Sequence, residues 1–282
     1  MLITGKGLGG SWMIRGEQLG HEIGATVIPK ASLRKINAAN SILCIKKPNK
    51  EIQARTSTAP LIWDIVDSWP QGGGKHKEDG STWDQSRLTE YILKVAKSIR
   101  PDILITATQK MAQDLGTIYP TYSLRHHGRT YQNKNQIKEN VTNIIYEGVD
   151  RYIDQWLDQL TTECKQRGWL LNMNQGNILD ADIVIALRGA PYRGYASDNW
   201  KSNIKLQNAQ NSGTPIICSR EAGYLETQSG GEIFADTPEE LTTAFDYLTP
   251  QENRLMCSEL LQKQEYYVAD AARDFLKIWP HG

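Results

Sequence analysis

Short aliphatic runs recur along this chain and alternate with longer stretches that have the apolar spacing of amphipathic helices. The clearest runs are Ser41–Ile45, Leu61–Asp67 and Ala181–Leu187. Continuous aliphatic runs of this kind are typical of strands that helices cover on both faces. Because such strands alternate with helical stretches, the sequence predicts parallel βα units and an α/β fold class.

The two halves of the chain show this alternation separately. The expected strands are Leu2–Thr4, Ala25–Ile28, Ser41–Ile45, Leu61–Asp67, Asp102–Ile105, then Asn143–Tyr146, Leu170–Leu171, Ala181–Leu187 and Pro215–Cys218. The expected helices are Ser11–Leu19 with Ser11 as N-cap, Trp83–Ser98, Thr108–Leu115, Ile153–Gln166, Ile204–Asn211 and Glu252–Trp279. A chain of 282 residues is long enough for two cores. We expect domains at 1–142 and 143–264, with the polar run Arg129–Asn140 as the linker.

Composition excludes several classes of protein. The mean hydropathy is −0.51, and the absence of a long uncharged apolar run excludes a transmembrane helix. The N-terminus enters a strand and a glycine turn without a signal-peptide segment. Four cysteines are far apart and lack CxxC spacing, so we expect them to be reduced and the protein to be cytoplasmic. They are Cys44, Cys164, Cys218 and Cys257.

The charges of the two halves have opposite signs, although the net charge is zero. Residues 1–145 contain 20 Lys and Arg against 12 Asp and Glu, a net +8, and the remaining residues contain 12 against 20, a net −8. One interpretation is that the first domain binds an anionic partner. The alternative is that these charges are scattered over a solvated surface.

The segment from Trp200 to Glu226 combines groups that suit a nucleotide. It places Lys201 and Lys205 at the start of a helix, and glutamates in the loop after the next strand. Lysines at a helix N-terminus favour phosphate, because the backbone N–H groups and the helix dipole attract anions. Glutamates in that loop, Glu221 and Glu226, are placed to accept hydrogen bonds from sugar or ribose hydroxyls.

This pattern resembles the donor-binding segment of the GT-B glycosyltransferases. Three other segments carry weaker resemblances: the strand that ends in Arg188-Gly189, the Pro-Glu-Glu-Leu helix near residue 240, and the Gly-rich first turn. The resemblance implies two Rossmann-like domains facing a cleft, with the acceptor in the first domain and the donor in the second. It also implies that the C-terminal helix, within 265–282, packs back on the first domain.

The resemblance further implies transfer of a sugar from a nucleotide diphosphate sugar, expected to be a UDP-sugar, without a cofactor. Lys201 and Lys205 would stabilise the diphosphate, Glu226 would hold the ribose, and Glu221 the ribose or the sugar. The expected donor-binding residues are Gly9, Gly10, Arg188, Lys201, Ser202, Lys205, Glu221 and Glu226. The chain departs from the family pattern at Trp200 and Asn208, where many retaining members carry glutamates.

The transfer needs a base that accepts the proton of the acceptor hydroxyl. Asp64, at the end of an expected strand, is the first candidate, and His126 or His127 is the second. The alternative for Asp64 and Asp67 is that they cap the turn after the strand.

Two other motifs favour different chemistry but are incomplete. Gly5-x-Gly7-x-Gly9-Gly10 follows a strand as in dinucleotide-binding folds, yet the second strand ends in Pro29-Lys30 without the acid that would bind the ribose. Asp180-Ala181-Asp182 matches the metal-binding DxD of another glycosyltransferase fold, but it precedes its strand instead of following it. We therefore expect neither NAD nor an obligatory metal.

The positive charge of the first half favours an anionic acceptor. Our first expectation is a hydroxymethylated base in DNA, since the compact size resembles phage-encoded glycosyltransferases and aromatics beside cations suit a flipped base. The alternative acceptor is an acidic or membrane-associated glycan. Expected acceptor-binding residues are Trp69, Lys75, Lys77, Arg125 and Arg129. Two other functions stay open: a non-catalytic nucleotide-sugar-binding protein, and an epimerase of the same fold.

Overall fold

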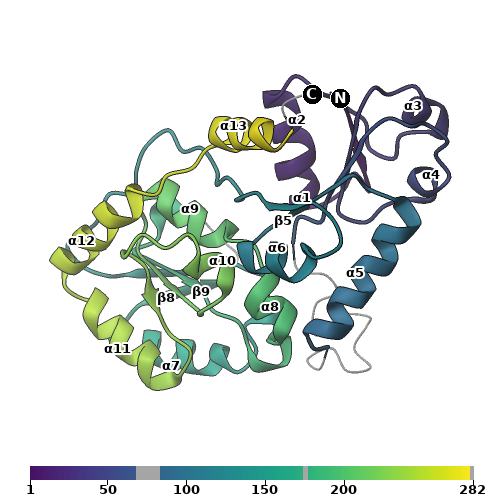
Figure 1. Ribbon diagram of the computed structural model, residues 1–282. Coiled ribbons are helices and arrows are strands. Elements are labelled where there is room, and N and C mark those ends of the chain that lie inside the picture. The colour runs from purple at the N-terminus through teal and green to yellow at the C-terminus, as the bar shows by residue number, and fades with distance from the viewer. Residues whose placement is uncertain (68–82, 174–176, 280–282) are drawn as a thin grey trace. The chain divides into compact units, whose positions relative to one another are not determined.

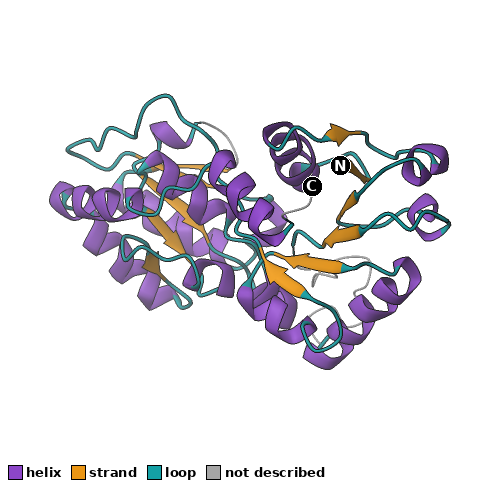
Figure 2. Cartoon of the chain, turned by 45° about the horizontal axis from the view of Figure 1, so that its top comes forward, coloured by secondary structure: helices purple, strands orange, loops and turns teal. Residues whose placement is uncertain are grey.

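The computed structural model describes residues 1–67, 83–173 and 177–279, so Trp69, Lys75 and Lys77 lie outside the described residues. The chain divides into two compact units. Unit 1 comprises Met1–His127, Gly194–Ser202 and Val268–Gly282, and unit 2 comprises Gly128–Arg193 and Asn203–Tyr267. Each unit has its own parallel sheet with helices on both faces, as Figures 1 and 2 show. The predicted α/β fold class is confirmed, with two Rossmann-like domains.

The sheet of unit 1 has six strands in the order β2-β1-β3-β4-β5-β6. The strands are β1 (Leu2–Gly5), β2 (Thr26–Val27), β3 (Ile42–Ile45), β4 (Leu61–Asp64), β5 (Ile103–Thr106) and β6 (Thr121–Ser123). The register of β3 and β4 pairs Ile45 with Asp64, so these two strands end side by side. Trp63 and Trp200 are fully buried in the core on one face of this sheet.

Helices surround this first sheet. They are α1 (Gly10–Trp12), η1 (Met13–Gln18, a π-helix), α2 (Leu19–Glu22), α3 (Leu33–Asn37), α4 (Lys50–Gln53), α5 (Gln85–Ile99), α6 (Gln109–Leu115), α8 (Tyr195–Trp200) and α13 (Val268–Ile278). Helix α13 packs on α2 within unit 1, and its Ala271, Ala272 and Phe275 are buried. The C-terminal end of the chain therefore contributes to the unit that also contains the N-terminus.

The sheet of unit 2 has five strands in the order β11-β10-β9-β7-β8. The strands are β7 (Asn143–Tyr146), β8 (Leu170–Met173), β9 (Ile183–Ala186), β10 (Ile216–Cys218) and β11 (Ile233–Phe234). Alternate residues point to opposite faces: Ile144 and Ile185 belong to one core, and Ile145 and Val184 to the other. This explains why the strands are apolar throughout.

The helices of unit 2 cover these two cores. They are η2 (Asp150–Tyr152), α7 (Trp156–Arg167), η3 (Ile178–Asp180), η4 (Ala190–Tyr192), α9 (Ile204–Ser212), α10 (Ala222–Leu225), α11 (Pro238–Leu248) and α12 (Gln251–Gln262). Helix α11 begins where a Thr237 hydroxyl accepts from the Glu240 N–H and Pro238 occupies the first turn, which is a favourable helix start.

The division into units differs from the expected one in two places. The run Arg129–Asn140 belongs to unit 2 instead of linking the domains. Asn135 fixes it there: its N–H donates to the Ser212 carbonyl at 2.8 Å and its amide donates to the Ala181 carbonyl at 2.7 Å. In addition, 194–202 returns to unit 1. Side-chain contacts of this kind leave no periodic signal in a sequence.

Two expected helices also differ. The helix expected over Glu252–Trp279 is two helices, α12 and α13, and Asn211 binds the non-helical Tyr266 between them by accepting from its N–H at 3.0 Å. The first helix begins at Gly10 with Gly9 as N-cap at φ 84°, not with Ser11. The Ser11 hydroxyl instead accepts a hydrogen bond from Lys46 Nζ at 3.3 Å.

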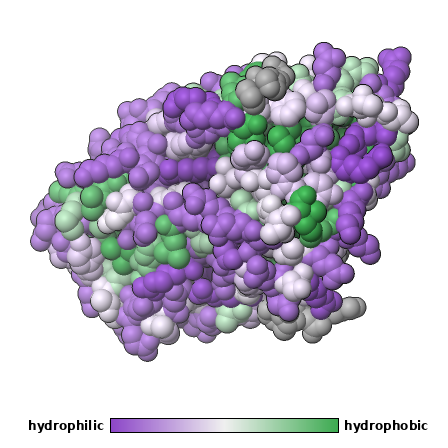
Figure 3. Space-filling view, in the orientation of Figure 1, coloured by the Kyte–Doolittle hydropathy of each residue, from purple (hydrophilic) through white to green (hydrophobic). Residues whose placement is uncertain are grey.

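The face that Figure 3 shows is mainly hydrophilic. On the face in Figure 3, hydrophobic side chains form separate patches within a polar surface. None of the helices in the described ranges is both long enough and apolar enough to cross a bilayer.

Candidate functional site

The carboxyl edge of the second sheet gathers charged side chains. Strands β7, β9 and β10 end at Tyr146, Ala186 and Cys218. Because they are parallel, the residues after them lie at one edge, which is where open α/β sheets bind ligands. The charged residues that follow within three positions are Glu147, Arg188, Arg220 and Glu221.

Arg188 and Glu221 form a buried ion pair. Arg188 Nε donates to Glu221 Oε1 at 2.8 Å, and 7% and 2% of the two side chains are exposed. The backbone of Arg188 is also held, since its N–H donates to the Ser219 hydroxyl and its carbonyl accepts from the Trp156 indole. Glu221 Oε2 is buried without a hydrogen-bond partner among the described residues. The pair therefore holds Glu221 in place and leaves one of its carboxylate oxygens able to accept a hydrogen bond.

Glu147 is a second carboxylate at this edge, and the sequence analysis did not single it out. Its Oε1 accepts from the Asn208 side-chain amide at 2.8 Å. Burial raises the pKa of Glu147, against the lowering effects of Asn208, Lys205 and Arg129. One sequence signal could have identified it: an acid directly follows the expected strand Asn143–Tyr146.

Lys205, in the first turn of α9, completes this part of the site. Its ammonium lies 5.1 Å from the centroid of the Tyr146 ring. It also lies 2.8 Å from where a Cβ on Gly148 would be, so a side chain at 148 would displace it. Lys205 thus lies at the sheet edge close to Glu147, and its phosphate-binding role stays a prediction.

The two glutamates predicted to bind hydroxyls do not lie together. Glu221 is the N-cap residue of the one-turn helix α10 and is buried, whereas Glu226 is the exposed C-cap residue of the same helix. The sequence placed both in one loop, but the helical turn between them separates their side chains.

Lys201 and Ser202 belong to unit 1 and bind the same acid. Lys201 Nζ contacts Asp67 Oδ2 at 2.6 Å, and the Ser202 N–H donates to Asp67 Oδ1 at 3.3 Å. Burial raises the pKa of Asp67, but Lys201 and Lys46 outweigh it and bring the pKa to about 2. Lys201 and Lys205 are therefore in different units, although they were predicted to act together.

Asp64 and His126 hold a strained turn after β4. Val66 has φ 70°, a left-handed conformation that is costly for a β-branched residue. Its N–H donates to Asp64 Oδ1 at 2.8 Å, and its carbonyl accepts from His126 Nε2 at 2.7 Å. Arg15 faces the other oxygen of Asp64 at 3.6 Å, with 1% of the Asp64 side chain exposed.

These contacts favour the capping interpretation of Asp64 over the catalytic one. Burial raises the pKa of Asp64 and lowers that of His126 well below its usual value. Burial and the charge of Arg15 lower the pKa of His127 to about 4, and its Nε2 lies 2.9 Å from Gln18 Oε1. Asp64, His126 and His127 are all closed off from solvent.

A basic cavity lies at the carboxyl edge of the first sheet, where β1 and β3 end. Its volume is about 240 Å³. It is lined by Lys6, Gly7, Leu8, Ser11, Trp12, Ile45, Lys46 and Lys47. None of these described lining residues is an acid, and the cavity opens beside the Gly-rich turn at the start of α1. Cβ atoms built on Gly9 and Gly10 would meet nothing within 4 Å, so the turn has open space beside these two glycines.

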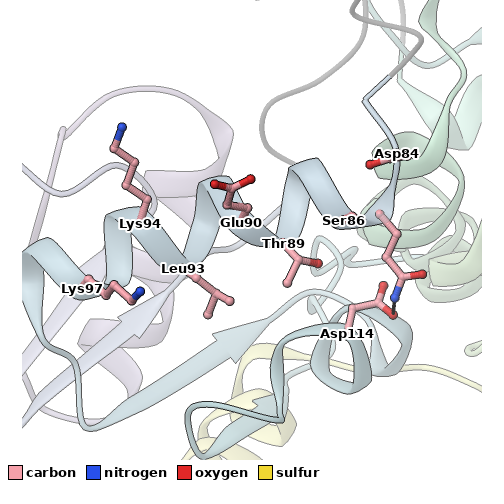
Figure 4. A pocket seen from close by; sticks show the side chains of 9 residues that line it. Asp84, Ser86, Thr89, Glu90, Leu93, Lys94, Lys97 and Asp114 are labelled. Carbon is pink, nitrogen blue, oxygen red and sulfur yellow. Dashed lines mark hydrogen bonds between the residues drawn. The ribbon is translucent and has the colours of Figure 1, made fainter.

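A larger groove of about 970 Å³ lies between α5 and α6 (Figure 4). Glu90, Lys94 and Lys97 line it with mixed charge, and Asp114 at its base accepts from Gln85 at 2.8 Å. It contains none of the candidate residues.

The two described candidates for acceptor binding belong to different units. Arg125 is half-buried in unit 1, and Arg129 is exposed in unit 2, where its N–H donates to Asn208 Oδ1 at 3.0 Å. Across the described ranges, no group of three or more His, Cys, Asp or Glu is arranged to hold a metal ion.

At the level of sequence, the chain matches no protein-family profile and no curated protein. At the level of structure it is similar to Anabaena Alr3699/HepE in complex with UDP and glucose, with a TM-score of 0.67 at 9% identity over 100% of this chain and 99% of that one. It is also similar to the lipopolysaccharide outer core galactosyltransferase WaaB, with a TM-score of 0.60 at 10% identity over 99% of each chain. The chain has the GT-B fold.

The match to TarM has a TM-score of 0.61 at 11% identity and covers 88% of this chain and 56% of that one. The chain thus spans little more than half of TarM, but nearly the whole of HepE and WaaB. Identities this low establish a shared fold, and the activity has to be argued from the chemistry of the site.

Proposed function

We propose that the protein is a glycosyltransferase that moves a sugar from a nucleotide diphosphate sugar, a UDP-sugar, to a hydroxyl group. The main support is the edge of the second sheet, where Glu147 and Glu221 each keep a buried carboxylate oxygen without a hydrogen-bond partner among the described residues, and where the Lys205 ammonium lies close to Glu147. This combination matches a donor that carries phosphate at one point and hydroxyls at others. HepE, which shares the fold, was solved with UDP and glucose.

The reaction breaks the bond between the anomeric carbon and the diphosphate oxygen, and forms a bond from the same carbon to the acceptor oxygen. The acceptor proton passes to a base, and the diphosphate leaves with increased negative charge. Lys205 stabilises that charge, and the buried carboxylates orient the donor through its hydroxyls.

The test is incubation with a panel of nucleotide sugars without an acceptor, followed by separation of the products. A glycosyltransferase slowly hydrolyses its donor to free sugar and nucleoside diphosphate. An epimerase would release an epimerised sugar, and a binding protein would show a thermal shift without any product. Either of these last two outcomes would refute the transferase proposal.

The acceptor proposal depends on charge. Unit 1 contains 20 Lys and Arg against 14 Asp and Glu, a net +6, and unit 2 contains 12 against 18, a net −6. Together with the basic cavity at Lys6, Lys46 and Lys47, this favours an acceptor that carries anionic groups. We propose DNA with a hydroxymethylated base as the first acceptor to test, and an acidic glycan as the second.

Binding to duplex DNA across a salt series tests the first acceptor. Contacts with several phosphates would make the affinity fall steeply as salt rises. No binding at low salt would exclude DNA, and a panel of acidic glycans would then be the next set of acceptors.

A further inference from the structure

The side chain of Asn208 fixes the carboxylate of Glu147. Asn208 is 3% exposed on α9. Its Oδ1 accepts from the Arg129 N–H at 3.0 Å, and its Nδ2 donates to Glu147 Oε1 at 2.8 Å. Because both ends of the amide are engaged, Asn208 cannot rotate without losing a buried hydrogen bond.

The other oxygen of the Glu147 carboxylate, Oε2, has no such contact. It is buried and has no hydrogen-bond partner among the described residues. A buried carboxylate oxygen without a partner is costly, and such atoms in a native structure call for an explanation. A ligand that donates hydrogen bonds to this oxygen would supply one.

The neighbours of Glu147 define the chemistry of that ligand. Lys205 is three residues before Asn208 on α9, so the two side chains lie on the same face of the helix. The Lys205 ammonium is held near Gly148, the residue after Glu147. A carboxylate that needs donors therefore lies beside a cation that attracts anions, which fits a molecule that joins hydroxyls to a phosphate.

We propose that Glu147 binds the 2′- and 3′-hydroxyls of the donor's ribose through Oε2, and that Asn208 is its positioning residue. The inference rests on the proposed function and names a residue for it. It transfers the ribose-binding role from Glu226, which lies exposed at the end of α10. Glu221 keeps the other buried carboxylate oxygen of the edge, oriented by Arg188.

The test is a cycle that removes the carboxylate and the hydroxyls in turn. Calorimetry measures the affinity of the wild-type protein and of Glu147→Gln for UDP and for 2′,3′-dideoxy-UDP. Loss of the hydroxyls should weaken binding to the wild type by about 10- to 100-fold, the range for a hydrogen bond to a charged group. In Glu147→Gln the same loss should cost no more than about threefold, because the two changes remove one interaction. The exposed Glu259→Gln on α12 is the matched control and should behave like the wild type.

A second variant shows whether a result in Glu147→Gln comes from loss of the carboxylate or from misfolding. Glu147→Gln combined with Asn208→Asp keeps both side-chain lengths, a hydrogen bond between them and the local charge. It should also lose most of the discrimination between the two nucleotides, because the carboxylate no longer stands at 147. Equal penalties for the missing hydroxyls in wild type and variants would overturn the role of Glu147. The role of Glu147 would also be overturned if Glu147→Gln weakened binding of the intact nucleotide sugar but left the affinity for UDP unchanged. Failure of the wild type to bind any nucleoside diphosphate would instead overturn the proposed function together with this inference.

Discussion

The carboxyl edges of the two sheets have the same architecture but are lined by different side chains. At the edge of the second sheet, Glu147 and Glu221 each keep a buried oxygen without a hydrogen-bond partner among the described residues, and Lys205 lies close to Glu147. At the edge of the first sheet, Lys201 binds Asp67, and Arg15 faces Asp64 Oδ2, which is also buried without a hydrogen bond among the described residues. Lysines line the cavity at this edge. The scaffold thus fixes where a site can form, and the residues after each strand decide which ligand it fits.

The largest effect should come from breaking the buried ion pair of the second edge. Arg188→Ala leaves Glu221 charged and buried, so the free energy of unfolding should fall by about 3–5 kcal/mol. Arg188→Met combined with Glu221→Gln should cost much less, because no unpaired charge remains. Urea unfolding measures both. Equal losses in the single and double variants would show that packing, not charge, accounts for the contribution of this pair.

Replacing Lys205 tests whether the edge of the second sheet binds the leaving diphosphate. Lys205→Ala should lower kcat by about 100- to 1,000-fold, the range for losing one group that stabilises developing negative charge. The unfolding free energy should change by less than about 1 kcal/mol, since the side chain is at the edge of the core. Lys165→Ala, an exposed lysine on α7, is the control. Unchanged turnover in Lys205→Ala would contradict the donor assignment.

The ion pair between Asp67 and Lys201 at the first edge makes the free energy of unfolding depend on pH. The pKa of Asp67 is lowered to about 2, so its ionised form stabilises the fold above its unfolded pKa of about 3.9. That stabilisation, about 2 kcal/mol, is lost as the pH falls from about 4 to 2. Asp67→Asn should therefore be less stable than wild type at pH 7, and the gap should close over this range. A gap that persists at pH 2 would mean that the Lys201 contact does not depend on charge.

The basic cavity should have the smallest and most specific effect. If the acceptor is DNA, each of Lys6→Gln, Lys46→Gln and Lys47→Gln that removes a phosphate contact should reduce the slope of log affinity against log salt by about 1. UDP binding should stay unchanged. The control is Lys263→Gln, an exposed position in unit 2. A loss of UDP affinity in the cavity variants would assign the cavity to the donor and remove the contrast between the two edges.

The elements of the fold could be predicted from sequence because burial on both faces makes strands such as Ile183–Ala186 continuously apolar. The division into units could not, since it depends on contacts such as those of Asn135. The residues of the candidate site could likewise be predicted only in part. The sequence predicts that Arg188 lies at a strand end. It does not predict that Lys201 pairs with Asp67, because the two are 134 residues apart. The role of Glu147 likewise depends on Asn208, 61 residues further along the chain.

We expect the donor nucleotide to bind at the edge of the second sheet and not in the basic cavity of the first. Backbone amide NMR shifts during a UDP titration test it most directly. If the nucleotide binds at the second edge, the largest shifts should be at 146–148, 187–189, 205–208 and 219–221, which surround Glu147, Arg188, Lys205 and Glu221. Shifts confined to 6–11 and 45–47 would contradict it, because the nucleotide would then bind at the lysine-lined edge.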